Sequence, residues 1–511
     1  MNPQQGNVGG LPRFPVSYWL ASSSRPSYGK LEKDLTVDVA VIGAGIAGIT
    51  TAYLLAQAGK RVVLLEAGRL LGGTTGHTTA KLTAQHDLIY DELIRRFGQD
   101  DALFYYAANR DGMDFVRRKI LELDIDCDYA VEDAYLYAAD EEQIRLVQLE
   151  YEAYLKLGIP CRLEDGIPLP IAARSAVAMT GQARFHPVPY LTKLLEEFEK
   201  MGGLVYEQTT VETVEEGEPS VVHTKDGGRV TCLDVVSCSH FPVFESGMYF
   251  ARLHAVSSYA LAFRMPGELP RGMYLSAGDP KRSVRAITYR GEQLLLVGGE
   301  SHDTGQDDCT SGRYEALSAF ARETFGAGDI LYRWSAHDLI TPDKLPYAGR
   351  ATSKHPRSYV ATGFRKWGMS NGTAAALLIR DLILGIENPY ANLFDPTRHL
   401  ASGGVKSLVA HNADVAVQYV KGKLPWLTKK VQDLGPDQGA LIRHEGKKAA
   451  AYRDPEGRLH IMDATCTHMG CEVSWNEGDR TWDCPCHGSR FDSTGGVKAG
   501  PAVEPLKMLK E

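Results

Sequence analysis

The feature that most constrains the fold is the stretch VDVAVIGAGIAGITTAYLLAQAGKRVVLLEAG at residues 37–68. Its apolar run at 37–42 predicts a buried strand, which a glycine turn joins to a helix ending at about Ala58. A second apolar run predicts another strand at 62–66. Strand, turn, helix and strand form a complete βαβ unit, so we expect a Rossmann-like α/β domain.

Three glycines and one acid in this unit have the spacing of an adenine-dinucleotide site. Gly43 permits the tight turn, Gly45 lets a pyrophosphate approach the backbone, and Gly48 allows close helix packing. The phosphates would lie at the helix N-terminus, beside Ile46 and Ala47. Glu66 ends the second strand, where a ribose hydroxyl is bound in such sites.

The next loop, RLLGGTTGHTTAKLTAQH at residues 69–86, distinguishes between FAD and NAD. It resembles the flavin-contacting loop of the D-amino-acid oxidase-like superfamily. The resemblance implies FAD as the cofactor. It also implies contacts to FAD from Ala67, Thr74, Thr75, His77 and Thr79.

A second resemblance lies in YVATGFRKWGMSNGTAAALLIRDLILG at residues 359–385, which predicts a strand, a glycine turn and a helix beginning near Asn371. The superfamily has such an element beside the flavin ring, preceded by a segment like DKLPYAG at 343–349. The alternative is an ordinary βα unit. The resemblance implies flavin contacts from Gly363, Gly368, Met369 and Ser370, and an adenine contact from Val211. One departure is DVVSCSH at 234–240, where many such flavoproteins have a strand ending in Ala-Thr-Gly.

The middle of the chain supplies a place for a substrate. The sequence contains no second glycine fingerprint after a strand, which argues against a separate nicotinamide domain. Residues 88–123 have helical periodicity, and 254–265 and 283–299 read as strands, the latter as a hairpin around 290–292. Helices and an antiparallel sheet inserted between flavin-binding segments match the superfamily's substrate domain.

Four cysteines and two histidines are concentrated near the end of the chain, whereas the other five of nine cysteines are scattered singly. Cys466 and His468 form C-x-H, and Cys484 and His487 form C-x-x-H after fifteen intervening residues. Two cysteines on one iron and two histidines on the other is the ligand set of a Rieske 2Fe-2S centre. A tetrahedral zinc site is the competing interpretation.

Resemblance to respiratory Rieske proteins favours the iron-sulfur cluster over zinc. It implies a disulfide between Cys471 and Cys486, at the offsets where those proteins join their two cluster loops. Ser489 and a proline loop, GPAVEPL at 500–506, also match. Phe491 stands where those proteins usually have tyrosine, so one hydrogen bond toward the cluster is lost. We therefore expect a lower potential within the Rieske range of about −150 to +300 mV.

These interpretations predict the domain organisation of the 511 residues, which are too many for one core. We expect an N-terminal extension at 1–35, an oxidoreductase at 36–400, a linker at 401–424 and an all-β Rieske domain at 425–511. Within the oxidoreductase, we assign 36–95, 170–240 and 330–400 to FAD binding, and 96–169 and 241–329 to an inserted antiparallel-sheet substrate domain. The whole is α/β, or α+β overall.

Composition limits the partners and the location. The net charge of -8 makes nucleic acid an unexpected partner. The first residues lack the basic start and apolar core of a secretory signal, and no stretch resembles a membrane span, so we expect a cytoplasmic protein without an integral membrane segment.

The combination resembles a bacterial type in which an FAD-dependent oxidoreductase is fused to a C-terminal Rieske domain. The resemblance implies oxidation of an amine or amino acid at a C–H next to nitrogen, with electrons passing to the cluster and on to an external carrier. One alternative is an electron-transfer protein that serves a partner oxygenase and binds no small substrate. Another is a redox sensor or assembly factor with vestigial catalysis.

The sequence gives less direct evidence for the catalytic residues than for the cofactor-binding residues. His77 resembles a histidine that some relatives link covalently to FAD; the alternatives are a hydrogen-bond donor and a plain turn residue. Arg365, Lys366 and Trp367 would either line the substrate cavity or cap the turn. Lys81 could likewise line the substrate cavity or have only a structural role. The aromatic residues at 104–110 are expected on the buried side of a helix.

Overall fold

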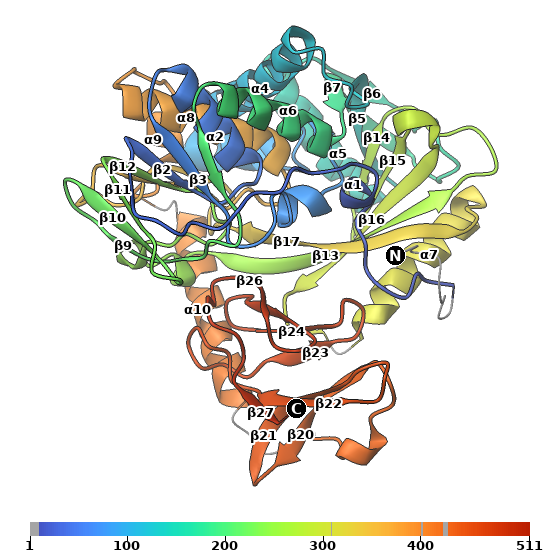
Figure 1. The fold of residues 1–511 in the computed structure, drawn as a ribbon. Coiled ribbons are helices and arrows are strands. Elements are labelled where there is room, and N and C mark those ends of the chain that lie inside the picture. The colour runs from blue at the N-terminus through green and yellow to red at the C-terminus, as the bar shows by residue number, and fades with distance from the viewer. Residues whose placement is uncertain (1–9, 308, 400–401, 423–427, 511) are drawn as a thin grey trace.

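A computed structural model of the chain describes residues 10–307, 309–399, 402–422 and 428–510. The part predicted to be an oxidoreductase contains three sheets, and the predicted C-terminal Rieske domain lies against one side of it (Figure 1). None of the helices in these ranges is long and apolar enough to cross a membrane.

A six-stranded sheet forms the centre of the dinucleotide-binding part, and its strands are parallel except for β18 at one edge. Helix α2 packs against α6 and α8. In sheet order the strands are β18 (Tyr347–Arg350), β19 (Ser358–Thr362), β12 (Asp234–Ser237), β2 (Val39–Ile42), β3 (Val62–Leu65) and β8 (Leu204–Tyr206). The helices are α2 (Ile46–Gln57), α6 (Pro187–Lys200) and α8 (Gly368–Leu384). The predicted βαβ unit is therefore present, with its first strand starting at Val39.

A nine-stranded mixed sheet forms the second layer. Its pairs are antiparallel except for β14 with β5. In order, the strands are β17 (Ile330–Ile340), β13 (His254–Arg264), β16 (Leu294–Asp303), β15 (Arg282–Ile287), β14 (Met273–Ser276), β5 (Ala130–Ala138), β7 (Ser175–Arg184) and β4 (Lys81–Leu82), with β6 (Cys161–Glu164) paired to β7. The hairpin predicted at 283–299 is the antiparallel pair β15 and β16.

Three of these strands differ from the predicted division of the chain. We assigned 36–95, 170–240 and 330–400 to FAD binding, but β4, β7 and β17 belong to the nine-stranded sheet. Strand β17 pairs with β13 from Ile340 to Ile330, and β7 pairs with β5 from Arg184 to Ser175. These pairings join segments far apart in the chain, so the local pattern of the sequence does not specify them.

The remaining helices lie around these sheets. The helical stretch predicted at 88–123 is two helices, α3 (Tyr90–Phe97) and α4 (Gln99–Glu122), because Gly98 has a φ of 93° between them. The others are α1 (Tyr18–Ala21), α5 (Glu141–Lys156), α7 (Thr310–Phe325) and α9 (Ala391–Phe394). A small sheet completes this part, with the order β1 (Leu35–Thr36), β11 (Arg229–Cys232), β10 (Ser220–Thr224) and β9 (Val211–Glu215).

Two four-stranded antiparallel sheets form the Rieske domain. The outer sheet contains β20 (Gln438–His444), β21 (Lys447–Arg453), β22 (Leu459–Asp463) and β27 (Met508–Lys510). The inner sheet contains β23 (Ser474–Asn476), β24 (Thr481–Asp483), β25 (Arg490–Asp492) and β26 (Val497–Ala499), and it lies nearer the oxidoreductase (Figure 1).

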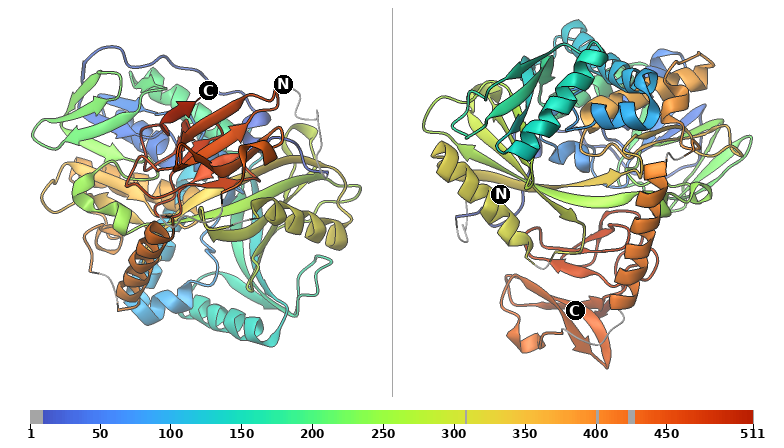
Figure 2. Two further views of the ribbon diagram at one scale, coloured as in Figure 1. Left: turned by 90° about the horizontal axis from the view of Figure 1, so that it is seen from below. Right: turned by 180° about the vertical axis from the view of Figure 1, so that it is seen from behind.

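The segment predicted as a linker contains helix α10 (Ser402–Gly422), which runs from the oxidoreductase along the Rieske domain (Figure 2). Asn412 donates a hydrogen bond to the Ala251 carbonyl at 2.9 Å, and His411 and His254 share one between their Nδ1 atoms at 3.0 Å. Residues 402–422 of the predicted linker therefore form a helix that contacts the oxidoreductase part. Residues 401, 423 and 424 of that prediction lie outside the described ranges.

The predicted N-terminal extension also packs on the molecule. Arg333 of β17 donates hydrogen bonds to the Pro12 carbonyl at 2.6 Å and to the Arg13 carbonyl at 2.9 Å. Trp19 of α1 is 1% exposed and donates to the Thr78 carbonyl at 2.7 Å. The extension thus holds the loop that follows β3.

Candidate flavin and iron-sulfur site

The dinucleotide turn is shaped by glycines that no other residue could replace without movement. Gly43 has a φ of 98°, and a Cβ there would lie 2.6 Å from the Cys238 carbonyl oxygen. A Cβ on Gly48 would lie 1.8 Å from the Gly43 carbonyl oxygen, and one on Gly45 would lie 2.9 Å from Thr75 Oγ1. The segment at 238–240, where the sequence departs from Ala-Thr-Gly, thus packs directly against the turn.

Glu66 lies at the end of β3, as the fingerprint predicts, and its carboxylate accepts hydrogen bonds from two backbone amides. Ala44 donates to Oε2 at 2.8 Å and Gly68 donates to Oε1 at 2.9 Å. Burial raises the pKa of this carboxyl. Each oxygen keeps a second lone pair, so both can still accept a ribose hydroxyl from the cavity.

The flavin loop contains a 3-10 turn (Thr74–His77) held from several directions. Thr74 Oγ1 donates to the His337 carbonyl at 2.8 Å, and Trp334 Nε1 donates to the His77 carbonyl at 2.9 Å. The Ile46 amide donates to Thr75 Oγ1 at 3.1 Å, which ties the loop to the N-terminus of α2.

The His77 side chain lines the cavity, and its Nδ1 shares a hydrogen bond with the Gly73 carbonyl at 2.8 Å. A carbonyl only accepts, so Nδ1 carries the proton and Nε2 is left without one in the neutral ring. Burial lowers the pKa of His77 to about 4. At neutral pH the ring is therefore uncharged.

The glycine turn before α8 has an unusual backbone. Gly363, Arg365 and Lys366 have φ values of 74°, 47° and 72°, and for the last two this left-handed conformation is strained. The Arg365 guanidinium donates to the His86 carbonyl at 2.6 Å, and the Trp367 ring stacks on the His86 ring at 5.0 Å. These contacts support the strained turn.

Helix α8 begins at Gly368, earlier than the predicted start near Asn371, because Gly368, Met369 and Ser370 already have helical conformation. Ser370 is 1% exposed, and its hydroxyl hydrogen-bonds to His86 Nε2 at 3.0 Å. It therefore faces the protein interior.

A single cavity of about 1150 Å³ joins these elements. It extends from the dinucleotide turn past the flavin loop to the nine-stranded sheet. Thirteen of the sixteen predicted cofactor residues line it: Gly43, Gly45, Ile46, Ala47, Glu66, Ala67, Thr74, Thr75, His77, Thr79, Val211, Gly368 and Met369. Gly48, Gly363 and Ser370 do not, because the first packs on Gly43, the second faces Thr341 and the third faces His86.

The residues predicted for catalysis line the same cavity on the side of the nine-stranded sheet. Lys366 Nζ donates to Ser301 Oγ, and burial lowers the pKa of its ammonium. Lys81 is 7% exposed and donates to the Tyr274 carbonyl at 2.8 Å. Burial raises the pKa of Asp338, another lining residue, to about 6.

The four predicted cluster ligands come together on two loops. The Cys466 and Cys484 thiols share a hydrogen bond, which together with amides of the first loop lowers the pKa of Cys466 to about 7. The rings of His468 and His487 lie 5.0 Å apart at 90°. His487 Nδ1 is buried without a hydrogen-bond partner among the described residues. Paired sulfurs beside paired imidazoles fit a cluster with two cysteines on one iron and two histidines on the other.

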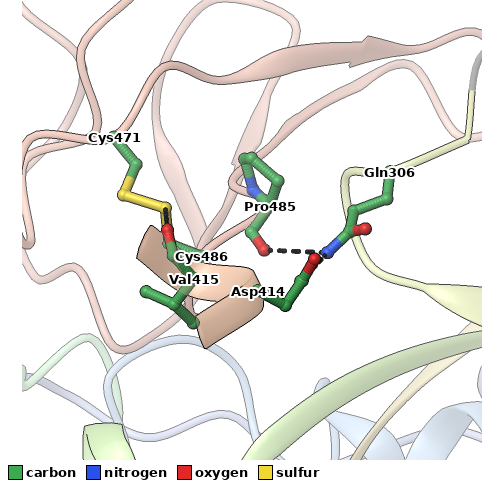
Figure 3. The surroundings of a disulfide bond; sticks show 6 residues. All are labelled: Gln306, Asp414, Val415, Cys471, Pro485 and Cys486. Carbon is green, nitrogen blue, oxygen red and sulfur yellow. Dashed lines mark hydrogen bonds between the residues drawn. A yellow bond between two sulfur atoms is a disulfide. The ribbon is translucent and has the colours of Figure 1, made fainter. Parts of the chain in front are cut away.

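A disulfide joins Cys471 to Cys486, with an S–S distance of 2.01 Å, as the respiratory resemblance implied. Figure 3 shows it beside α10, where Gln306 Nε2 donates to Asp414 at 2.8 Å and to the Pro485 carbonyl at 3.5 Å. The cluster loops are thus tied to each other and lie against both α10 and the oxidoreductase.

The Rieske domain also contributes walls to the flavin cavity. Thr467, His468, Asp479, Arg490 and residues 497–503 line it. Arg490 is 5% exposed, donates to Asp479 at 2.7 Å, and reaches Ser335 Oγ on β17 at 3.2 Å. Ser335 follows Trp334, which holds the flavin loop. Sequence reasoning missed these residues, because the contact joins positions 155 apart and no local signal marks it.

The fold and the two sites together define a flavin-dependent oxidoreductase that has its own Rieske iron-sulfur domain. The family model described as FAD dependent oxidoreductase matches residues 38–382, and the Rieske [2Fe-2S] domain model matches 426–510. The chain belongs to the FAD dependent oxidoreductase family, and it binds FAD and a Rieske 2Fe-2S cluster.

Similar proteins share either the whole architecture or the oxidoreductase part. A Bacillus subtilis (strain 168) protein named as a Rieske 2Fe-2S iron-sulfur protein, YhfW, is 45% identical over 97% of both chains. γ-Glutamylputrescine oxidoreductase of Escherichia coli (strain K12) is 24% identical, over 72% of this chain and 89% of its own. Glycine oxidase from Geobacillus kaustophilus has the same fold, with a TM-score of 0.62 and 20% identity over 72% of this chain and 100% of its own.

Proposed function

We propose that the protein is an amine or amino-acid dehydrogenase whose electrons leave through its own Rieske domain to an external carrier. The observation that carries the proposal is the shared cavity, because the flavin loop and the cluster ligand His468 line the same space. The names of the γ-glutamylputrescine oxidoreductase and the glycine oxidase give further support for an amine substrate.

When bound, FAD would accept a hydride from the C–H next to nitrogen, and the cluster would transfer single electrons. The protein's own residues would bind and orient the cofactor and the substrate. The start of α2, with Gly45, Ile46 and Ala47, lines the cavity where a pyrophosphate would be held, and Glu66 would take a ribose hydroxyl.

On the substrate side, Trp367 offers an aromatic face and Arg365 and Lys366 offer cationic groups to the cavity. Lys366 stays tied to Ser301, and its amide bonds the Asp338 carboxyl. We assign these residues to holding and orienting the substrate, and His77 to contacting the flavin ring. Positioning of this kind supplies much of the rate in hydride transfer.

The test is an anaerobic screen of the purified holoprotein against amines and amino acids. Flavin absorbance and the electron paramagnetic resonance signal of the reduced cluster are recorded together. A compound that bleaches the flavin, followed by growth of the cluster signal, supports the dehydrogenase. If no compound does so while a cellular reductase reduces both centres, the protein is an electron carrier for a partner enzyme.

The same experiment addresses two further parts of the proposal. Flavin that stays with the denatured polypeptide would support a covalent link at His77, whereas its release would leave His77 as a hydrogen-bonding residue. Slow reoxidation by oxygen compared with a one-electron acceptor would support an external carrier. The cytoplasmic location expected from the sequence remains a prediction.

A further inference from the structure

His337 on β17 contacts both halves of the molecule. Its side chain is 6% exposed and lines the flavin cavity. Its carbonyl accepts the hydrogen bond from Thr74 of the flavin loop. A Cβ on Gly488 would lie 2.7 Å from His337 Nε2, so the imidazole packs directly on the backbone of the residue that follows the cluster ligand His487.

The imidazole of His337 is buried without the partners that a buried polar ring normally has. Neither its Nδ1 nor its Nε2 has a hydrogen-bond partner among the described residues. The same holds for Nε2 of His240, whose ring lies 5.3 Å away and also lines the cavity. Leaving a buried polar group unsatisfied costs about 1–3 kcal/mol, so these free nitrogens indicate a ligand in the cavity.

We propose that His337 is a bridging residue that hydrogen-bonds to bound FAD on one side and packs on Gly488 of the cluster loop on the other, so that electrons cross between the two centres here. This inference rests on the proposed function and deepens it, because it names the point of transfer. FAD could satisfy these nitrogens, since it is polar, fits a cavity of this size and would contact the adjoining flavin loop.

Each crossing moves one electron. The reduced flavin loses it, and one ferric ion of the cluster becomes ferrous. Two crossings therefore balance the two electrons of one hydride, and an external one-electron acceptor such as ferricyanide reoxidises the cluster after each. The released proton goes to solvent.

The experiment uses holoprotein and does not depend on knowing the substrate. Bound flavin is reduced by a laser flash with EDTA as the electron donor, and the absorbance of flavin and cluster is followed. The dissociation constant of FAD is measured separately. The variants are His337→Leu, which removes both nitrogens, and His337→Gln, which keeps one donor and one acceptor. The matched control is His355→Leu, since His355 lies on a loop that does not line the cavity.

We expect H337L to raise the dissociation constant of FAD about tenfold, as for one lost hydrogen bond at a buried site. In FAD-saturated protein, its rate of cluster reduction should fall at least tenfold. H337Q should recover FAD affinity to within about threefold of the wild type, and H355L should match the wild type in both measurements.

An unchanged rate of cluster reduction in FAD-saturated H337L would overturn the inference while leaving the proposed function standing. If H337L does not fold, His337→Phe takes its place, because it keeps an aromatic ring but removes both nitrogens. Unchanged FAD affinity and an unchanged rate of cluster reduction in H337F would overturn the inference equally. Conversely, cluster reduction that depends on His337 in a protein that no amine reduces would support the inference and refute the proposed dehydrogenase.

Discussion

Phe250 presents its ring to His487, with the ring centroids 5.9 Å apart and the planes at 86°. The same ring lies 6.4 Å from that of His468. Phe250 belongs to a 3-10 turn of the oxidoreductase (Tyr249–Ala251), so one of its aromatic side chains contacts both histidines that are predicted to bind the cluster. The histidine side of the cluster therefore faces the flavin cavity.

Replacing Phe250 with alanine should slow electron transfer from flavin to cluster without weakening FAD binding. The change removes the aromatic contact that keeps both histidine rings against the oxidoreductase, and such pairs contribute about 0.5–1.5 kcal/mol beyond their buried area. We expect the rate of cluster reduction, measured by anaerobic stopped-flow absorbance, to fall about tenfold.

The matched control for Phe250 is Phe104→Ala. Phe104 is 36% exposed on α4 and packs on Tyr390, away from the Rieske domain. It should leave the rate unchanged. Equal rates in F250A and the wild type would mean that this contact does not hold the cluster in its reducible position.

Lys81 should make the free energy of unfolding rise with pH, and replacing Lys81 should remove this dependence. Burial, assisted by Arg285, lowers the pKa of Lys81 to about 7 from the ordinary value of 10.5 for a lysine. The charged form is thus favoured in the unfolded chain, and its cost to the folded state is complete below pH 7 and is relieved as pH rises toward 10.5. Relative to Lys81→Met, the wild type should gain about 3 kcal/mol between pH 6 and pH 9.

Urea unfolding at the two pH values, followed by tryptophan fluorescence, measures this difference for Lys81. Lys33→Met is the control, because Lys33 is exposed and no hydrogen bond or ion pair is described for it. A wild-type protein whose advantage over K81M is the same at pH 6 and pH 9 would show that Lys81 keeps an ordinary pKa in the folded state.

Local patterns of the sequence were sufficient for features that depend on neighbours in the chain. The spacing of Gly43 and Gly48 predicts the turn because a Cβ on Gly48 would meet the Gly43 carbonyl, only five residues away. The short spacings from Cys466 to His468 and from Cys484 to His487 likewise predict one cysteine and one histidine on each of two loops. Helix α8 begins three residues before the predicted start, because Gly368, Met369 and Ser370 already have helical conformation.

Contacts between distant segments could not be predicted in this way. The apolar spacing in α10 is weak, and its helix is stabilised by neighbours such as Ala251 and His254 that lie far away in the chain. Arg490 and Phe250 connect the two halves of the molecule, yet each looks like an ordinary residue in its own segment. Their roles depend on how the Rieske domain docks, which single-chain periodicity does not encode.

Gly48→Ala should abolish FAD binding. A Cβ there would lie 1.8 Å from the Gly43 carbonyl oxygen, so helix α2 must move away from the turn that would hold the pyrophosphate. Gly267→Ala is the control, because a Cβ at Gly267 meets no atom within 4 Å. Flavin absorbance per polypeptide after purification measures the outcome. G48A protein that retains a full complement of FAD would show that the close approach of α2 is not required.

Cys486→Ser should make the iron-sulfur cluster labile while sparing the flavin. The Cys471–Cys486 bond closes a loop that contains Cys484 and ends one residue before His487, with the bonded cysteines 15 residues apart. A cross-link over a loop of this length contributes about 3 kcal/mol in the chain-entropy model. We therefore expect the paramagnetic resonance signal of the reduced cluster in C486S to decay at least tenfold faster in the presence of a chelator, with unchanged flavin content. Cys309→Ser, which alters an exposed cysteine outside the cluster loops, should behave as the wild type.

The same faster decay should appear when wild-type protein is treated with a thiol reductant, because reduction breaks the same bond. A C486S cluster as durable as that of the wild type would mean that packing against α10 and the oxidoreductase is sufficient to hold the two loops together.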